Sequence, residues 1–119
     1  MMKTLVIGAS TNPMRYSFLA INKLLSYKHE VVAIGLKKGY VNEVEIQTEQ
    51  IPFEDIDTVT LYLNPTNQLP YYDYILSLKP KRVIFNPGTE NPELVEILKN
   101  HQIKAEIACT LVLLSTNQF

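Results

Sequence analysis

The sequence predicts a single α/β domain, residues 1–119, built on a mostly parallel sheet. Five short apolar segments alternate with segments in which apolar residues recur at helical spacing, the pattern of repeated strand–helix–strand units. Three of the five are apolar without interruption, as strands are when helices cover both faces of a sheet. A chain of 119 residues, 46% of them hydrophobic, suits one domain with a buried core.

The first half of the chain contains two predicted strands around one helix. The run Leu5-Val6-Ile7 predicts a buried strand within Lys3–Gly8, ended by the glycine. A helix is expected over 17–27, with Ser17 as its cap. The second strand is Glu30–Gly35, again continuously apolar. The polar stretch 36–53 is expected to be irregular, with at most a short extended piece at Val44-Glu45-Ile46.

The second half contains three predicted strands and two helices. Asp57–Leu63 alternates apolar and polar residues and predicts the third strand, followed by a helix over 67–78. The fourth strand, Lys81–Phe85, is continuously apolar at Val83-Ile84-Phe85. Asn91 is placed to cap the third helix, with Pro92 at its first position. Ile103–Ile107 alternates again and predicts the fifth strand.

The strand patterns also predict the order of the sheet. The two alternating strands, 57–63 and 103–107, are expected at the edges, where one face is wetter, and the continuously apolar strands in the middle. The predicted fold is therefore a three-layer, Rossmann-like α/β fold with a five-stranded sheet in the order 3-2-1-4-5 and helices on both faces. A flavodoxin-like order, 2-1-3-4-5, arises from the same local signals. The apolar tail 108–115 is either a final helical turn or an additional edge element.

Charge and composition narrow the class of function. Eleven basic and 12 acidic residues give a net charge of −1, so the chain lacks the basic footprint of a duplex-binding protein. No apolar run approaches the ~20 residues that a membrane span requires. The single cysteine excludes an internal disulfide framework. We expect a cytoplasmic protein that binds neither nucleic acid nor membrane.

The loop after the first strand is the strongest candidate for a binding site. Gly8 permits a sharp turn, and the small residues Ala9, Ser10 and Thr11 allow close approach of a ligand to the backbone. Backbone N–H groups at the start of the next helix form a suitable cradle for a pyrophosphate. The loop is neither Gly-x-Gly-x-x-Gly nor a Walker loop. Arg15 is a candidate phosphate partner; a merely exposed arginine is the equal alternative.

The end of the second strand distinguishes between nucleotides. A NAD site usually has an acidic residue there, which holds the ribose hydroxyls. This strand instead ends Gly35-Leu36-Lys37-Lys38, and two lysines suit a ribose phosphate, such as the 3′-phosphate of coenzyme A or the 2′-phosphate of NADP. A solvated loop is the alternative reading of Lys37 and Lys38.

Asn-Pro follows three of the predicted strands, as Asn12-Pro13, Asn64-Pro65 and Asn86-Pro87. Any single copy is explained by turn formation alone. Three copies at one edge of one sheet favour a shared rim with amide side chains directed at a ligand. Gly88-Thr89-Glu90 offers a further set of N–H donors or simply leads to the Asn91 cap.

Groups suited to catalysis are sparse. His29 and His101 lie at predicted helix ends, and Cys109 lies in an apolar run, where a packed small residue is the commoner role. Tyr71, Tyr72 and Tyr74 lie along one helix and suit packing better than base stacking. No His/Cys cluster has metal-ligand spacing, so no metal is expected.

The decapeptide Gly8-Ala9-Ser10-Thr11-Asn12-Pro13-Met14-Arg15-Tyr16-Ser17, the Asn-Pro ends of strands three and four and the late Ala108-Cys109-Thr110 resemble the small stand-alone CoA-binding proteins. These are similar to the N-terminal CoA-binding domain of the succinyl-CoA synthetase α subunit. The resemblance covers nearly the whole chain. It implies phosphate binding by the first loop, ribose phosphate binding by Lys37 or Lys38, and an adenine and pantetheine path along the ends of strands three and four. Many relatives carry Val-Asn-Pro where this chain has Ile34-Gly35-Leu36, and the synthetase's phosphorylated histidine belongs to a domain that has no counterpart here.

The sequence therefore predicts non-catalytic binding of coenzyme A or an acyl-CoA. The predicted cofactor-binding residues are Gly8, Ala9, Ser10, Thr11, Asn12, Pro13, Arg15, Ser17, Lys37, Lys38, Asn64, Pro65, Asn86, Pro87 and Gly88. Two alternatives stay open: an NAD(P)-binding, oxidoreductase-like domain, and a structural subunit with a decayed nucleotide site that works by association. The second is motivated by the tyrosine-bearing helix and by Leu111-Val112-Leu113-Leu114, which also leave a homo-oligomer or an unknown protein partner open.

Overall fold

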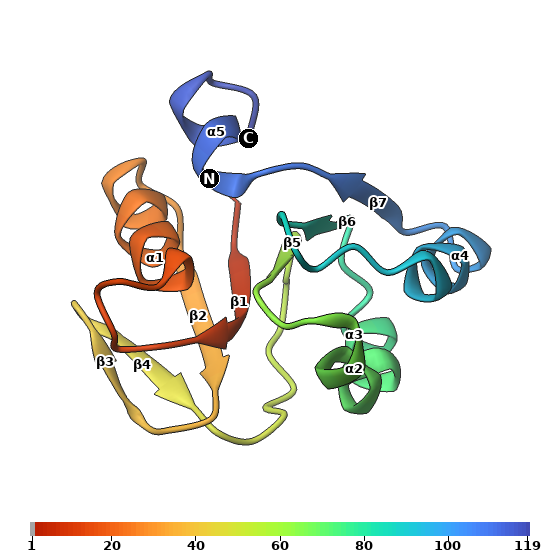
Figure 1. Ribbon diagram of the computed structural model, residues 1–119, viewed down its shortest axis with the longest axis horizontal. Coiled ribbons are helices and arrows are strands. Elements are labelled where there is room, and N and C mark those ends of the chain that lie inside the picture. Colours follow the sequence, from red (N-terminus) through yellow and green to blue (C-terminus); the bar gives the residue numbers. More distant parts are fainter. Residues whose placement is uncertain (1) are drawn as a thin grey trace.

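A seven-stranded sheet runs through the computed structural model, which describes residues 2–119 (Figure 1). The strands lie in the order β3-β4-β2-β1-β5-β6-β7, and every neighbouring pair is parallel except β3 and β4. Their bounds are β1 (Thr4–Ala9), β2 (Val31–Gly35), β3 (Gly39–Val41), β4 (Val44–Gln47), β5 (Thr58–Leu61), β6 (Arg82–Phe85) and β7 (Lys104–Ile107). The predicted α/β class with a mostly parallel, Rossmann-like sheet is confirmed.

Helices cover both faces of the sheet and make three layers (Figure 1). They are α1 (Tyr16–Ser26), α2 (Pro65–Gln68), a 3₁₀ turn at Leu69–Tyr71, α3 (Tyr72–Leu78), α4 (Pro92–Asn100) and α5 (Thr110–Ser115). α1 and α5 pack on one face, where Ile21, Leu24 and Leu114 join a buried cluster with Val6 and Ala33. The tail 108–115 thus supplies the helical turn that the sequence left open.

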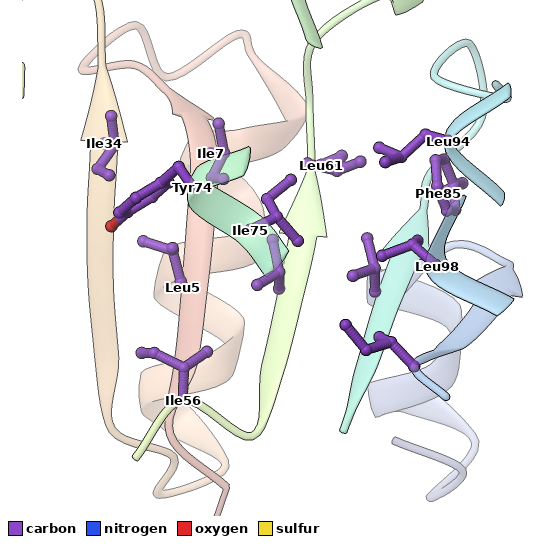
Figure 2. Close-up of a cluster of buried hydrophobic side chains, with 13 residues drawn as sticks. Leu5, Ile7, Ile34, Ile56, Leu61, Tyr74, Ile75, Phe85, Leu94 and Leu98 are labelled. Atoms are coloured by element: carbon purple, nitrogen blue, oxygen red, sulfur yellow. The ribbon is translucent and has the colours of Figure 1, made fainter. Parts of the chain in front are cut away.

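α3 and α4 cover the opposite face. Figure 2 shows Tyr74 and Ile75 of α3 lying over the side of the sheet that carries Leu5 and Ile7. Leu98 and Leu94 of α4 pack in the same cluster with Phe85. Successive side chains of a strand point to opposite faces, so Leu5 and Ile7 enter one core and Val6 the other. This explains why β1 is apolar without interruption.

The predicted count and order of strands, five in the order 3-2-1-4-5, are wrong. The third predicted strand, 57–63, forms β5, which lies beside β1 in the middle of the sheet and not at an edge. The outer position next to β2 belongs to the hairpin β3–β4, which forms from the stretch expected to be irregular. The expected extended piece at 44–46 lies in β4. The other predicted edge strand, 103–107, does lie at an edge, as β7.

The misplacement of β5 has a physical cause. Its polar residues Thr58 and Thr60 are fully buried because their hydroxyls have partners inside the protein. The Thr58 hydroxyl accepts from Arg82 Nε at 2.9 Å, and the Thr60 hydroxyl pairs with that of Thr110 at 2.8 Å. Alternation of apolar residues with threonine therefore does not mark a solvent-facing strand here.

Two predicted helix boundaries also change. The helix expected over 67–78 begins earlier, at Pro65, because the Asn64 side chain caps it, and it is broken by a 3₁₀ turn that contains Pro70. Proline has no N–H group to continue the ladder of hydrogen bonds. Ser17 is not the cap of α1: Arg15 occupies that position and makes no capping hydrogen bond with its side chain. The Asn91 cap of α4 is confirmed, with its side chain accepting from Leu94 N–H at 3.3 Å.

Candidate functional site

Loops that follow β1, β2, β5 and β6 lie at one edge of the sheet, here called the carboxyl edge. Parallel strands end at the same edge, and the chain leaves β1 for β2 on one side and returns to β5 on the other. Ligands of open α/β sheets bind where the strand order reverses in this way. The loop that follows β1, the β1–α1 loop of residues 10–15, lies at this point (Figure 1).

The β1–α1 loop is held in shape by its own short polar side chains. The Ser10 hydroxyl accepts from the Asn12 N–H at 3.1 Å, and the Asn12 side-chain oxygen accepts from the Met14 N–H at 3.0 Å. The Asn12 carbonyl then accepts from the Arg15 N–H at 3.0 Å. These turns bring the chain round to the start of α1 and use the N–H groups of Asn12, Met14 and Arg15.

Three of the four glycines allow the backbone to pass close to this loop. Gly8 has φ +93°, and a Cβ on it would meet the backbone of Tyr62 at 2.9 Å. A Cβ on Gly35 would lie 2.2 Å from the Ala9 carbonyl oxygen, and one on Gly39 would lie 2.6 Å from Thr11 Cγ2. The strand pairing shifts by one residue at Gly8, so that Ala9 rather than Gly8 lies beside Gly35.

Several N–H groups at this loop have no acceptor within residues 2–119. Those of Ser10 and Thr11 make no hydrogen bond to the protein, and neither do those of Tyr16 and Ser17 in the first turn of α1. Thr11 is exposed and Ser10 is half-buried. Free N–H donors at the positive end of an 11-residue helix are the arrangement that binds phosphate groups.

The other two Asn-Pro loops lead to helices that an asparagine side chain caps. Asn64 accepts from the Asn67 N–H at 2.9 Å and so caps α2. The Gly88 N–H donates to the Glu90 carboxylate at 2.8 Å. This N–H was predicted as a donor to a ligand, and it already has an acceptor within the protein. Asn91, which caps α4, also donates to Gln68 Oε1 at 2.8 Å. Of the three loops, the β1–α1 loop alone leaves its helix uncapped within the described chain.

Asn86 lies behind this edge and not on it. Only 2% of Asn86 is exposed, and its side-chain nitrogen donates to Thr60 Oγ1 at 2.6 Å and to the Leu61 carbonyl at 2.9 Å. Its side-chain oxygen accepts from the Thr110 N–H at 2.8 Å. These bonds link the end of β6 to β5 and to the start of α5, so the Asn86 amide stabilises the fold and has no donor or acceptor directed at the edge. The neighbouring Pro87 and Gly88 are exposed, as is Pro65 in the preceding loop.

The predicted basic residues lie in reach of solvent. Lys37 and Lys38 are both exposed, directly after β2, and Arg15 is exposed at the start of α1. None of the three forms an ion pair with a residue of the described chain. Gly39, which touches Thr11, immediately follows the two lysines, so the lysines and the β1–α1 loop are close in space. The structure thus brings the predicted phosphate loop and the predicted ribose-phosphate lysines together.

Three further titratable side chains, those of His29, Cys109 and Tyr62, are each partly buried. His29 is at the opposite edge of the sheet, where its Nδ1 accepts from the Met2 N–H and burial lowers its pKa. Cys109 is half-buried, immediately before α5. Burial raises the pKa of Tyr62 to about 12, so this phenol is neutral at physiological pH. Among residues 2–119 no group of His, Cys, Asp or Glu side chains is arranged to hold a metal ion, and no helix could cross a membrane.

Sequence reasoning missed the close contacts at Gly35 and Gly39 and the hydrogen bond that Glu90 accepts. The chain has only four glycines, and all of them lie at the carboxyl edge. Their small number and their positions near the ends of predicted strands are a signal that the sequence contains. The roles of Gly35 and Gly39 depend on contacts between β1, β2 and β3. Those contacts follow from the strand order, which the sequence did not reveal.

Known proteins resemble this chain in sequence and in fold. A family profile described as "CoA binding domain" matches residues 2–115. A crystal structure of an uncharacterized protein is 55% identical, with a TM-score of 0.98 over 100% of this chain and 98% of that one. No curated protein matches significantly.

Two further solved structures share the fold at low sequence identity. A Thermus thermophilus protein, cell-free ID.343, has a TM-score of 0.86 at 18% identity, over 99% of this chain and 90% of that one. A dinucleotide-forming acetyl-coenzyme A synthetase 1 from Ca. Korarchaeum cryptofilum, solved with phosphate and ADP, has a TM-score of 0.69 at 19% identity. In that case 87% of this chain matches 25% of the larger one.

Proposed function

Because the chain belongs to the family of CoA binding domains, we propose that it binds coenzyme A or an acyl-CoA at the β1–α1 loop and performs no reaction on it. The observation that carries this proposal is the contrast among the three Asn-Pro loops. Asn64 and Asn91 cap α2 and α4, whereas α1 starts with no side-chain cap and with free N–H groups around it.

The pyrophosphate of coenzyme A suits these donors. Its charge is negative, the start of α1 carries the positive end of the helix dipole, and backbone N–H groups donate to phosphate oxygens. Ser10 and Thr11 supply two of the N–H groups, and Tyr16 and Ser17 supply two more. Ser17 is 3% exposed, so it would contribute through its backbone and a hydroxyl close to the loop, without projecting into solvent.

The 3′-phosphate of the ribose suits Lys37 and Lys38. Both are exposed and free of ion pairs within residues 2–119, and Gly39 beside them touches the β1–α1 loop. Arg15, exposed at the start of α1, is a third cation for the phosphates. The far side of the site would be formed by the exposed residues Pro13, Asn64, Pro65, Pro87 and Gly88 and by the backbone of Asn86.

Calorimetric titration of the purified protein with coenzyme A, dephospho-coenzyme A, NAD⁺ and NADP⁺ tests the ligand. We expect coenzyme A to bind most tightly, and dephospho-coenzyme A more weakly because it lacks the 3′-phosphate. A preference for NADP⁺ would favour the oxidoreductase-like alternative. Binding of all four only above millimolar concentration would contradict the proposal.

A lysine variant with a matched control tests the 3′-phosphate contact. Neutralising both residues in Lys37→Gln/Lys38→Gln should weaken coenzyme A about three- to thirtyfold, since each exposed ion pair contributes about 0.3–1 kcal/mol. Affinity for dephospho-coenzyme A should stay nearly unchanged. The control Lys28→Gln/Lys99→Gln removes the same charge at a distance from the carboxyl edge and should change neither. If the Lys37/Lys38 variant lost the same factor in affinity for both ligands, the assigned contact with the 3′-phosphate would be contradicted.

A further inference from the structure

A fully buried glutamine, Gln68 at the end of α2, bridges two loops at the carboxyl edge. The strands β5 and β6 are paired neighbours, and the chain continues from them into the β5–α2 loop (residues 62–64) and the β6–α4 loop (residues 86–91). The Gln68 side-chain nitrogen donates to the Leu63 carbonyl in the first loop and to the Thr89 carbonyl in the second, each at 2.8 Å.

The neighbours of this amide fix its orientation. Leu63 and Thr89 both present carbonyl oxygens, which only accept hydrogen bonds, so the NH₂ group of Gln68 must face them. The Gln68 side-chain oxygen accepts from the Asn91 side chain at 2.8 Å, and the Asn91 oxygen in turn caps α4. Gln68 therefore joins both loops and the start of α4, and both of its N–H groups and its oxygen are in use.

The first of the two bridged loops adjoins the proposed phosphate site. Leu63 Cδ2 would lie 3.1 Å from a Cβ on Gly8, so Leu63 packs against the end of β1, from which the β1–α1 loop starts. The second bridged loop contains the exposed residues Pro87 and Gly88. Gln68 thus fixes the neighbour of the phosphate site relative to the next loop along the carboxyl edge.

The proposed phosphate contacts place one half of coenzyme A beside these two loops. Lys37 and Lys38, the proposed partners of the 3′-phosphate, follow β2, whereas the proposed pyrophosphate site follows β1. The adenosine half would therefore lie on the β2 side of β1. The pyrophosphate joins that half to the pantetheine arm, so the arm would extend the other way, over the ends of β5 and β6, which follow β1 in the order of the sheet.

We propose that Gln68 is a positioning residue for the pantetheine arm: its bonds to the Leu63 and Thr89 carbonyls set the spacing of the β5–α2 and β6–α4 loops, along which the arm binds. This inference rests on the proposed function. Gln68 is fully buried, so it acts through the two loops and does not touch the ligand. A bridge that only stabilised the fold would not distinguish a ligand with the arm from one without it.

Two ligands that differ in the arm test the proposal. Adenosine 3′,5′-bisphosphate contains the adenine, the ribose, the 3′-phosphate and the first phosphate of the pyrophosphate, and it lacks the arm. Gln68→Met keeps the length of the side chain and removes its three hydrogen bonds. In calorimetric titrations it should weaken binding of coenzyme A at least about fivefold and that of adenosine 3′,5′-bisphosphate less than about twofold, because misplaced loops lose their contacts with the arm alone.

Two further variants complete the test. Gln68→Glu keeps the acceptor for Asn91 and can donate to at most one of the two carbonyls, so it should weaken coenzyme A with the same selectivity, even if Gln68→Met does not fold. The control Thr58→Val removes a buried hydroxyl that accepts from Arg82 at 2.9 Å, at the opposite end of β5 from the loops. It should lower the urea midpoint and change neither affinity.

Amide NMR spectra of the ligand-free proteins separate this inference from the proposed function. The signals of Leu63 and Gly88, which lie in the two loops outside the peptide groups bonded to Gln68, should shift in Gln68→Met and stay in place in Thr58→Val. Equal weakening of both ligands by the Gln68 variants, unchanged affinity for coenzyme A, or loop signals that do not shift would overturn the inference. If the unaltered protein binds neither ligand, the proposed function fails and the assigned role toward the arm fails with it, while shifted loop signals would still support Gln68 as the bridge.

Discussion

Replacing Asn86 by alanine should destabilise this protein far more than the same change at Asn64, although both asparagines precede a proline at the carboxyl edge. Asn86 makes three hydrogen bonds while 2% exposed, to Thr60, Leu61 and Thr110. Asn64 is exposed and makes one, to the Asn67 N–H. The two variants therefore compare a buried asparagine amide with an asparagine helix cap, each from an Asn-Pro pair.

The magnitude follows from these contacts. A hydrogen bond contributes about 1 kcal/mol net, so three bonds amount to about 3 kcal/mol. Two effects act in opposite directions: the buried Thr110 N–H loses its partner, which adds to the cost, while the Thr60 hydroxyl keeps its bond to the Thr110 hydroxyl, which reduces it. We expect about 3 kcal/mol for Asn86→Ala and about 1 kcal/mol for Asn64→Ala, as for other asparagine caps.

Urea unfolding followed by circular dichroism measures both values, and thermal unfolding provides a check. For a domain of this size 1 kcal/mol corresponds to about 4 °C in Tm, so Asn86→Ala should lower Tm by about 12 °C and Asn64→Ala by about 4 °C. Equal losses in the two variants, or a loss below about 1 kcal/mol for Asn86→Ala, would refute the reasoning. The Asn86 amide would then be free to face a ligand, as the repeated dipeptide first suggested.

Three other changes have expected outcomes that stability measurements can check. Gly8→Ala should cost at least about 2 kcal/mol, because alanine at φ +93° is strained and its Cβ would meet the Tyr62 backbone; an unchanged urea midpoint would contradict this. Burial raises the pKa of Tyr62 to about 12, above the value of about 10 in the unfolded chain, so its contribution to stability is complete below pH 10 and is lost as the pH rises from 10 to 12. Tyr62→Phe should therefore lose less stability than the unaltered protein between pH 9 and pH 11.5. Equal losses of stability in the two proteins over this range would contradict the raised pKa of Tyr62. Burial lowers the pKa of His29, so its contribution is present above about pH 6.5 and is lost as the pH falls below that value. His29→Gln should shrink the difference in urea midpoint between pH 7.5 and pH 5, and an unchanged difference would exclude His29 as its source.

Local patterns in the sequence predicted the individual elements well. The run Leu5-Val6-Ile7 lies in β1 with both faces covered, and Asn91 caps α4 with Pro92 at its first position. Both features depend on residues within one turn or one strand, where side-chain chemistry and backbone preference act together. The β1–α1 loop was also identified locally, since its short polar residues are adjacent in the chain.

The sequence failed where a residue's environment depends on distant parts of the chain. Thr58 and Thr60 alternate with apolar residues as in an edge strand, yet they are buried in the middle of the sheet because Arg82 and Thr110 satisfy their hydroxyls. The pairing of β4 with β2 likewise depends on two segments whose local signals were weak. Hydrogen bonds across the sheet decided these positions.

The sequence by itself determined the α/β class, the parallel sheet and the small-residue loop after its first strand, because hydrophobic periodicity and turn chemistry act over a few residues. Only the tertiary structure decided which of the helices after these loops starts without a side-chain cap. The three Asn-Pro pairs are indistinguishable as dipeptides, but Asn64 caps its own helix, Asn86 is buried among three partners and Asn12 shapes a loop whose helix is uncapped. The Asn64 cap and the Asn12 turn form between residues at most three apart. The burial of Asn86 among its partners depends on strand order, which local patterns do not contain.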